Sequence, residues 1–269
     1  MSELRFEFGR NWKSFSKSLD EERIRSSVIN LQRLLQEDDL KGKTFLDVGS
    51  GSGLSSVAAA KLGARLFSFD YDKNSVDSTR QNLSQYCKGG SYEVQQGSAI
   101  NPEYMTKLGH FDVVYSWGVL HHTGEMWNGI DLASKCVKPG GKFALAIYND
   151  QGGASNRWKS IKKTYVNLPG FLQLGLVLFV ATYFEVRSSL IRLIRMQNPL
   201  PFKDWASRKD DRGMSVWHDL VDWVGGYPFE VAKPDEIFVF LKDRGFQLES
   251  MKTCGGGHGC NEFLFTKID

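Results

Sequence analysis

The feature of this sequence that most constrains its fold is a regular alternation of short apolar runs with helical stretches. Five apolar runs predict strands, at 44–48, 65–69, 92–95, 111–117 and 142–148. Amphipathic or alanine-rich stretches at 54–62, 74–86 and 125–137 separate most of them. Strands that alternate with helices form a parallel sheet with helices on both faces, and right-handed crossovers fix most of the topology. The sequence therefore predicts an α/β fold of the Rossmann-like kind.

The alternation is interrupted once, which predicts an insertion. It stops after Asn149 and resumes with a helix that begins at Pro234 and ends near Gly245. Two strand-like runs, Phe246–Lys252 and Phe263–Lys267, close the chain, with a glycine-rich turn or hairpin between them. We expect a core at 40–150 and 231–269, and a helical insertion or substrate lid at 151–230. Residues 1–39 are expected to form an aromatic lid and a helix at about 20–36.

Composition excludes several classes of protein. Hydrophobic residues make up 41% of the 269-residue chain and charged residues 24%, which is a globular and not a disordered balance. The small net charge of +3 does not suggest a nucleic-acid partner, because a surface that tracks phosphates needs Lys and Arg clustered on one face. Four cysteines and an N-terminus without a signal-type apolar core favour a cytoplasmic protein.

The strongest local signal is the run FLDVGSGSGLSS at 45–56. A strand ends in it, Gly49, Gly51 and Gly53 follow, and a helix begins at once. Glycines let the backbone turn sharply and let a ligand approach without Cβ interference. The N-terminus of the helix adds exposed N–H groups that suit a carboxylate.

Asp70 predicts a ribose-binding site, whereas Asp47 and the spacing of the glycines distinguish this site from a dinucleotide site. Asp70 ends the second strand, where a carboxylate can accept both hydroxyls of a ribose. The glycines follow the pattern G-x-G-x-G, whereas nicotinamide enzymes use G-x-G-x-x-G, and Leu54 stands where that pattern needs its last glycine. Asp47 would repel a pyrophosphate but attract the α-ammonium of a methionine moiety. These residues favour S-adenosylmethionine, with S-adenosylhomocysteine as product.

In its motifs the chain resembles class I S-adenosylmethionine-dependent methyltransferases, small-molecule type, in an uncharacterised bacterial branch. The segments LDVGSGSG, FDYD (69–72), QQGSAI (95–100), FDVVYSWGVLHHT (111–123) and VKPGGKFALAIYN (137–149) match the family's motifs in order. The resemblance implies a seven-stranded, mostly parallel sheet with its last strand antiparallel. It also implies cofactor contacts from Asp47, Gly49, Ser50, Gly51, Gly53, Asp70, Tyr71, Ser98, Ala99, Ser116 and Trp117. Ser98 departs from the family, which often has an acid there, and a hydroxyl accepts a weaker hydrogen bond than a carboxylate.

The acceptor side of the site carries two histidines. His121 and His122 follow the fourth strand, beside the expected methyl position, and a histidine can take a proton at neutral pH. Both are candidate catalytic bases, with packing as the alternative. The stretch Ser116-Trp117-Gly118-Val119 lacks the Asn/Asp-Pro-Pro-aromatic motif of nucleic-acid amine methyltransferases and looks closer to small-molecule enzymes, including quinone-ring methyltransferases. Candidate acceptor contacts combine flat apolar surface with polar groups: Trp12, Tyr148, His218, Trp223, Tyr227 and His258.

Two further segments carry alternatives. Residues 171–184 contain no charge but are too short to span a bilayer, and 185–197 place apolar residues near one face. Through 171–197 we expect a lid, a homodimer surface, a peripheral membrane contact or ordinary burial. Cys254, His258 and Cys260 have no standard zinc spacing and no evident fourth ligand, so no metal is expected.

Three functions remain open at this stage. The first is O-methylation of a small-molecule or lipid-linked acceptor by in-line displacement. The second is C-, N- or S-methylation on the same scaffold, and the third is a non-catalytic protein that binds S-adenosylmethionine. Fold alone does not supply the acceptor.

Overall fold

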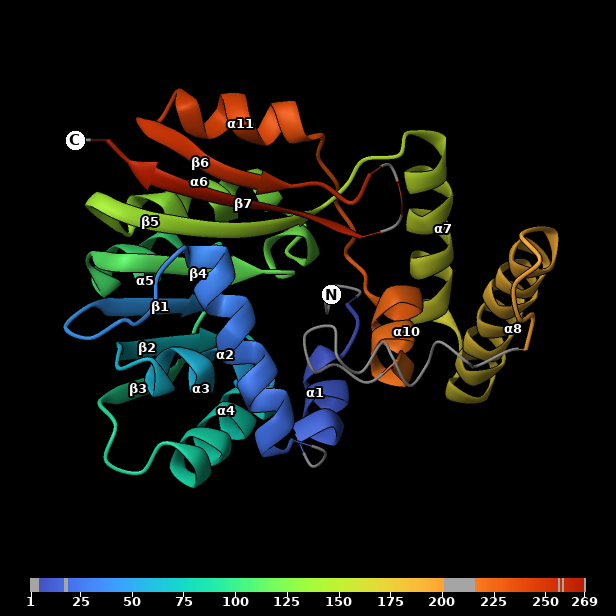
Figure 1. Cartoon of the computed structure of the whole chain (residues 1–269), viewed down its shortest axis with the longest axis horizontal. Coiled ribbons are helices and arrows are strands. Elements are labelled where there is room, and N and C mark those ends of the chain that lie inside the picture. The colour runs from blue at the N-terminus through green and yellow to red at the C-terminus, as the bar shows by residue number, and fades with distance from the viewer. Residues whose placement is uncertain (1–4, 17–18, 201–215, 256, 258, 269) are drawn as a thin grey trace.

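The computed structural model describes residues 5–16, 19–200, 216–255, 257 and 259–268. Its centre is a seven-stranded sheet in the order β3-β2-β1-β4-β5-β7-β6 (Figure 1). The strands are β1 (Thr44–Val48), β2 (Arg65–Asp70), β3 (Tyr92–Gln96), β4 (Phe111–Trp117), β5 (Val137–Tyr148), β6 (Phe246–Lys252) and β7 (Cys260–Lys267). β1 to β5 pair in parallel, and β7 lies antiparallel between β5 and β6. The expected mostly parallel sheet with an antiparallel last strand is confirmed.

One face of the sheet is covered by α2 (Glu21–Leu35), α3 (Leu54–Lys61) and α4 (Lys73–Tyr86). α2 begins where Asp20 accepts a hydrogen bond from the Arg23 N–H at 2.9 Å, and Glu21 and Glu22 occupy its first turn. Successive side chains of a strand point to opposite faces, so Phe45 packs toward these helices and Leu46 toward the other face.

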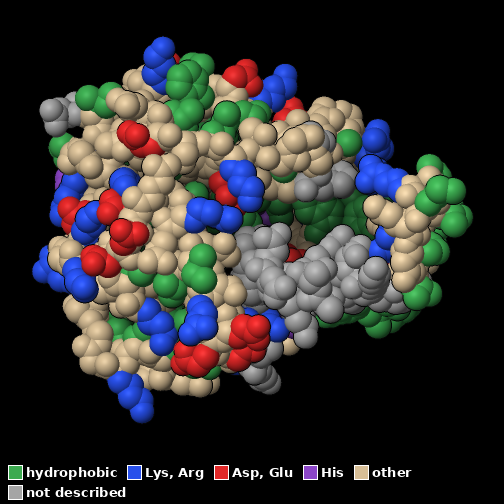
Figure 2. All heavy atoms as spheres, viewed as in Figure 1, with side chains coloured by type: hydrophobic (Ala, Val, Ile, Leu, Met, Phe, Trp, Pro, Cys, Tyr) green, Lys and Arg blue, Asp and Glu red, His purple; other side chains and the backbone are tan. Residues whose placement is uncertain are grey.

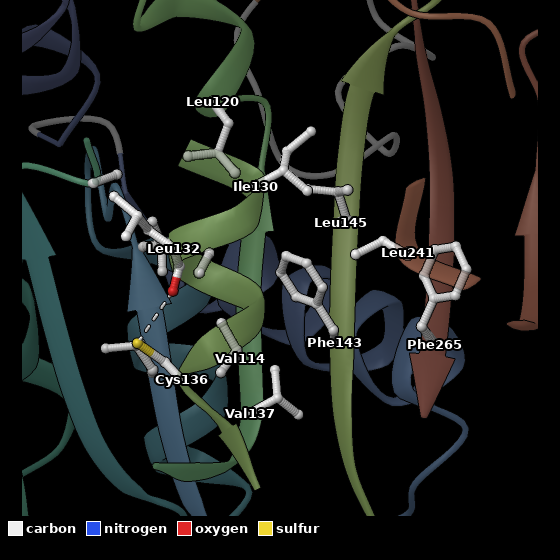
Figure 3. Packing of buried hydrophobic residues seen from close by; sticks show 14 of the residues in the cluster. Val114, Leu120, Ile130, Leu132, Cys136, Val137, Phe143, Leu145, Leu241 and Phe265 are labelled. Atoms are coloured by element: carbon white, nitrogen blue, oxygen red, sulfur yellow. Dashed lines mark hydrogen bonds between the residues drawn. The ribbon is translucent and has the colours of Figure 1, made fainter. Parts of the chain in front are cut away.

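The opposite face is covered by α5 (Pro102–Leu108), α6 (Met126–Lys135) and α11 (Pro234–Lys242). Figure 3 shows Ile130 of α6 and Leu241 of α11 on this side, against strand residues such as Val114, Phe143 and Phe265. All five side chains are fully buried. The packed core holds the ends of β1, β2 and β4 at one edge of the sheet, where open α/β folds bind ligands.

β5 is longer than the sequence predicts. Phe111 pairs with Val137 and Val113 with Lys142, so β5 has three more residues than its partner between these pairs. The Pro139-Gly140-Gly141 segment, expected to be a turn before the strand, is a bulge inside it. Gly140 has a φ of +70°, which a glycine adopts without strain.

The insertion contains α7 (Gly153–Asn167), α8 (Gly170–Ile194) and α10 (Val216–Gly225). Residues 171–184 and 185–197, treated separately in the sequence, form one 25-residue helix up to Ile194. By length and composition α8 could cross a membrane, and it is the one such helix in the ranges that the structure describes. The apolar segment predicted from the sequence, 171–184, was too short because one side of the helix stays apolar beyond Phe184. A small core of its own, including Tyr165, Val177, Val180 and Val224, joins the three helices.

The N-terminal segment closes the open end of the sheet. α1 (Phe8–Ser16) packs against α4 and α10, and the Phe6 N–H donates to the Tyr227 carbonyl at 2.9 Å. Figure 1 shows α1 between the sheet domain and α10. The N-terminus therefore links the core to the insertion.

Candidate active site

The turn between β1 and α3 has the backbone that its glycines predict. Gly49, Gly51 and Gly53 have φ values of +79°, +57° and +79°. A Cβ on Gly49 would lie 2.3 Å from Val119 Cγ1, so both the conformation and the space require glycine. The Gly49 N–H donates to the Phe69 carbonyl at 2.9 Å, which fixes the turn beside the end of β2.

Asp47 is a buried carboxylate beneath this turn. It is 1% exposed and accepts a hydrogen bond from the Ser56 hydroxyl at 2.5 Å. Burial raises the pKa of Asp47 to about 7, against the opposing Ser56 hydrogen bond and with a smaller contribution from the charge of Asp70. A cation that enters the cavity beside Asp47 would restore the charged form, since an opposite charge favours ionisation.

Asp70 organises the loop that faces Asp47. Its Oδ2 accepts from the Gly51 N–H at 2.9 Å and its Oδ1 accepts from the Asp72 N–H at 2.8 Å. Burial raises the pKa of Asp70 to about 6, although both backbone hydrogen bonds lower it. A carboxylate has about four lone-pair sites, so these two bonds leave acceptor capacity for ligand hydroxyls.

A cavity of about 990 Å³ connects these carboxylates to the insertion. It receives residues from the strand ends, the N-terminal segment, α8 and α10. Most of the expected site residues line it: Trp12, Asp47, Gly49, Ser50, Gly51, Asp70, Tyr71, Ser98, Ala99, Trp117, His122, Tyr148 and Trp223. The structure thus brings the expected cofactor and acceptor residues together in one space.

Five expected residues lie outside the cavity lining: Gly53, Ser116, His121, His218 and Tyr227. Gly53 precedes the first turn of α3, and the fully buried Ser116 donates to the Val48 carbonyl at 3.4 Å. His218 is half-buried with Arg23 as a charged neighbour, and the Tyr227 carbonyl accepts the Phe6 N–H. Ligand contact from these five positions stays a prediction, and the structure places none of them in the cavity lining. His258 lies outside the described residues.

Ser98 and Tyr71 border the cavity in different ways. The Ser98 hydroxyl accepts from the Ile100 N–H at 3.4 Å, so it is engaged in its own turn. The Tyr71 ring is 60% exposed, and the Arg5 guanidinium lies 4.7 Å from its centroid. Arg5 also donates to the His122 carbonyl at 3.0 Å and so bridges the ends of β2 and β4. Nothing in the sequence singled out Arg5 beyond its place in the aromatic leader.

The two histidines have different environments. His121 is fully buried, accepts from the Tyr148 N–H at 3.2 Å through Nδ1 and has its ring 3.9 Å from the Tyr148 ring. His122 lines the cavity, and its Nδ1 donates to the Pro228 carbonyl at 2.7 Å. Burial lowers the pKa of His122 to about 3, and Lys162 contributes in the same direction. His122 is therefore neutral, and with the proton on Nδ1 its Nε2 is an acceptor.

Four aromatic residues, which we call the aromatic wall, also line the cavity: Phe8, Trp12, Tyr148 and Trp223. Phe8 lies 4.6 Å from the His122 ring, and Tyr148 meets Trp223 edge to face at 5.3 Å. Flat apolar side chains with few polar anchors are typical of sites that bind small organic molecules.

A buried lysine behind this wall was missed from the sequence. Lys162 of α7 is 0% exposed, donates to the Trp223 carbonyl and lies 4.7 Å from the Trp223 ring and 4.8 Å from the Phe229 ring. Burial lowers its pKa to about 7, although the charge of Asp222 raises it. The spacing of Trp158, Lys162 and Tyr165 on one helical face was the available signal.

Comparisons with known proteins agree with this fold and site. A family model described as "Methyltransferase domain" matches residues 46–143. The ubiquinone biosynthesis O-methyltransferase of Coxiella burnetii (strain Dugway 5J108-111) is 31% identical over 122 residues, which cover 45% of this chain and 50% of that protein. The ribosomal protein L11 methyltransferase of Helicobacter hepaticus is 45% identical over 143 residues, covering 43% and 45%. The chain spans about half the length of the curated relatives it matches.

Solved structures with low identity share the fold over most of the chain. An O-methyltransferase family protein from Burkholderia thailandensis has a TM-score of 0.57 at 14% identity, covering 96% of this chain and 60% of that one. A putative methyltransferase from Bacillus halodurans C-125 has a TM-score of 0.56 at 12% identity, covering 90% and 99%.

The fold and the glycine-rich site define a Rossmann-like α/β protein of the methyltransferase type. Together with the family match, they show that residues 46–143 resemble a methyltransferase domain on a fold that solved methyltransferases share.

Proposed function

We propose that this protein binds S-adenosylmethionine and methylates a hydroxyl of a small-molecule or lipid-linked acceptor. The observation that carries the proposal is the single cavity that joins Asp47 and Asp70 to the aromatic wall and His122. Its volume of about 990 Å³ is at the upper end of ligand pockets, so it can hold a cofactor together with an acceptor.

The residues present fit the cofactor. Asp47 is a buried carboxylate with a raised pKa, and a neighbouring cation would stabilise its charged form. The α-ammonium of the methionine moiety would be that cation. The glycine turn at 49–51 lines the cavity, and Asp70 would accept the ribose hydroxyls. Ser98, Ala99, Tyr71 and Trp117 would border the remainder of the cofactor. When bound, S-adenosylmethionine would supply a methyl group activated by its sulfonium, which an in-line nucleophile would take while the sulfur leaves as the neutral thioether of S-adenosylhomocysteine.

His122 would receive the acceptor. Its Nε2 lone pair can accept a hydrogen bond from an acceptor hydroxyl and take its proton as the oxygen attacks. With a pKa near 3, His122 is too weak a base to ionise an aliphatic alcohol. This low pKa is more compatible with a phenol or quinol, whose ionisation costs far less than that of an aliphatic alcohol, and the flat aromatic wall would hold its ring. Tyr148, Trp12 and Trp223 are its proposed contacts.

A protein is the second candidate acceptor. The relative with 45% identity is named as a ribosomal protein L11 methyltransferase. C- or S-methylation, and binding of the cofactor without transfer, remain on the same scaffold; the [4+2]-cyclase SpnF has this fold at a TM-score of 0.54. We place the reaction in the cytoplasm, where the four cysteines, none joined by a disulfide, would stay reduced.

The proposal is tested by calorimetry with S-adenosylhomocysteine on the wild-type protein, on Asp70→Ala and on the surface control Asp77→Ala. Asp77 lies outside the cavity and is half exposed beside Arg80. We expect micromolar binding that Asp70→Ala weakens at least about tenfold, the cost of a lost charge-assisted hydrogen bond, while the control is unchanged. Binding of NADH, or equal binding by all three proteins, would refute the cofactor assignment.

A further inference from the structure

The outer face of α8 is apolar in a way that a helix of a water-soluble protein is not. Phe179, Phe171 and Ile194 are 70%, 75% and 82% exposed. The exposed side of the helix also carries Leu172, Leu174, Leu178, Tyr183, Val186, Leu190 and Leu193. Figure 2 shows hydrophobic side chains gathered at the edge of the molecule where Figure 1 places α8. A contiguous apolar surface of this kind marks a site of interaction.

The inner face of the same helix is polar in its second half. Glu185 and Arg192 form an ion pair at 3.9 Å with side chains that are 16% and 12% exposed. Arg192 also donates to the Ser189 hydroxyl at 3.5 Å, and Glu185 and Ser188 line the cavity. Over these turns α8 turns its polar residues toward the protein and its apolar residues outward, the reverse of ordinary amphipathic packing.

The charge around α8 identifies the kind of partner. Residues 151–200 contain seven Lys and Arg against one acidic residue, Glu185, and so carry a net charge of +6. The remainder of the chain, with 27 basic and 30 acidic residues, has a net charge of −3. Arg157, Lys159, Lys163 and Arg195 are exposed on α7 and at the end of α8. An apolar face flanked by cations is complementary to an anionic lipid surface.

The packing of α8 favours a position in the membrane interface over a span. Val177 and Val180 are buried against the small core with Tyr165 and Val224. Gln173 Nε2 donates to the Leu168 carbonyl at 3.0 Å. A helix that crossed the bilayer would have to leave the packing of Val177 and Val180 against the small core, whereas a helix that lies in the interface keeps it and buries its outer face in lipid.

We propose that α8 docks this protein on an anionic membrane surface, with its outer apolar face in the interface and the flanking cations on the lipid headgroups. Because α8 also lines the cavity through Ala181, Phe184 and Ser188, docking would set the cavity beside the lipid. The docking proposal does not depend on the proposed methyl transfer. Only the idea that docking delivers a lipid-linked acceptor to the cavity rests on that proposed function.

Flotation of the full chain with lipid vesicles tests the proposal. The probes are vesicles of phosphatidylcholine alone and of phosphatidylcholine mixed with phosphatidylglycerol in equal parts. We expect flotation with the mixed vesicles, weakened by salt, and much less with the neutral ones. No flotation with either composition would overturn the proposal.

Paired variants separate the apolar contribution from folding. Leu178→Ser with Phe179→Ser should weaken vesicle binding by about tenfold for each side chain, because each withdraws a large apolar group from lipid. Val239→Ser with Met251→Ser changes two exposed apolar residues outside the insertion and should leave binding unchanged. Circular dichroism checks that both remain folded.

A second copy of the chain is the other occupant that the test distinguishes. Light scattering should show a monomer without vesicles. A stable dimer that the Leu178→Ser and Phe179→Ser pair dissociates, together with absence of flotation, would assign the face to self-association and refute lipid docking. Equal flotation of the two serine pairs would refute it as well.

Discussion

Replacing Asp47 by asparagine should stabilise the protein that has no ligand bound, by an amount that grows with pH. Burial raises the pKa of Asp47 from 3.8 to about 7, so the folded state binds a proton that the unfolded state releases between these pH values. The stability of the wild-type protein therefore falls as pH rises from about 4 to about 7 because of this residue. The asparagine side chain cannot ionise, so the variant avoids this loss.

The magnitude follows from the two pKa values. Ionising Asp47 in place costs about 4 kcal/mol once the pH exceeds 7, at 1.36 kcal/mol for each pKa unit. At pH 5 the unfolded state already releases the proton, which costs about 1.6 kcal/mol, so the advantage of Asp47→Asn grows by about 3 kcal/mol between pH 5 and pH 8. With an unfolding entropy of about 2.1 cal/mol/K per residue, this corresponds to a difference in Tm that widens by about 5 °C.

The assay is the Tm of both proteins from pH 5 to pH 8, with Asp112→Asn, measured from pH 2 to pH 8, as a control of opposite sign. Burial raises the pKa of Asp112, but hydrogen bonds from Thr44 and from Lys138 outweigh this effect and lower the pKa to about 2. That variant should lose stability at neutral pH, with the deficit vanishing as the pH falls from 4 to 2. A Tm difference between Asp47→Asn and wild type that does not change with pH would show that Asp47 is not buried as an uncompensated acid.

Three further predictions concern the turn, the histidine and the buried lysine. Gly49→Ala should lower the free energy of unfolding in urea by about 3 kcal/mol, because the added Cβ meets Val119 and φ is positive. Gly140→Ala has a positive φ but open space around it, so it should lose only about 1 kcal/mol; equal losses would contradict the steric argument. His122→Gln should lower kcat about a hundredfold and leave the Kd of S-adenosylhomocysteine unchanged, whereas His110→Gln should change neither; unaltered turnover in the first would remove His122 from the chemistry. Lys162→Met should be more stable than the wild type, most of all below pH 7, because the folded wild-type protein must hold a buried charged amine there. The gain should shrink toward pH 10, and a gain that rises with pH would contradict the burial of the amine.

The core of the fold could be predicted because its signals are local. β1 and β4 begin and end at the residues that the apolar runs predict, since buried parallel strands read as short continuous apolar stretches, and the bounds of the antiparallel edge strand β6 also match the prediction. β5 was placed too short because its bulge contains Pro139 and glycines, which normally signal a turn. α5 was missed because its seven residues are too few for a helical period to stand out.

The site divides in the same way. The carboxylates and glycines lie within a few residues of two strand ends, so their spacing indicated their place. The sequence could not show that His122 lines the cavity while His121 is buried. The His121 ring contacts the Tyr148 backbone and the His122 ring contacts the Pro228 carbonyl, which lies about a hundred residues away in the sequence. Lys162 was hidden because a lysine in a basic helix normally faces solvent, and only tertiary packing buries it.

The separation of charge between the insertion and the remainder of the chain gives the molecule an electric dipole. An anionic plane exerts a torque on such a dipole before any atoms touch, so the basic end turns toward it during approach. At about 0.1 M salt this torque acts only within about 10 Å, the Debye length. The rate of productive encounters should therefore fall with ionic strength more steeply than the lifetime of the docked state, which apolar contact maintains.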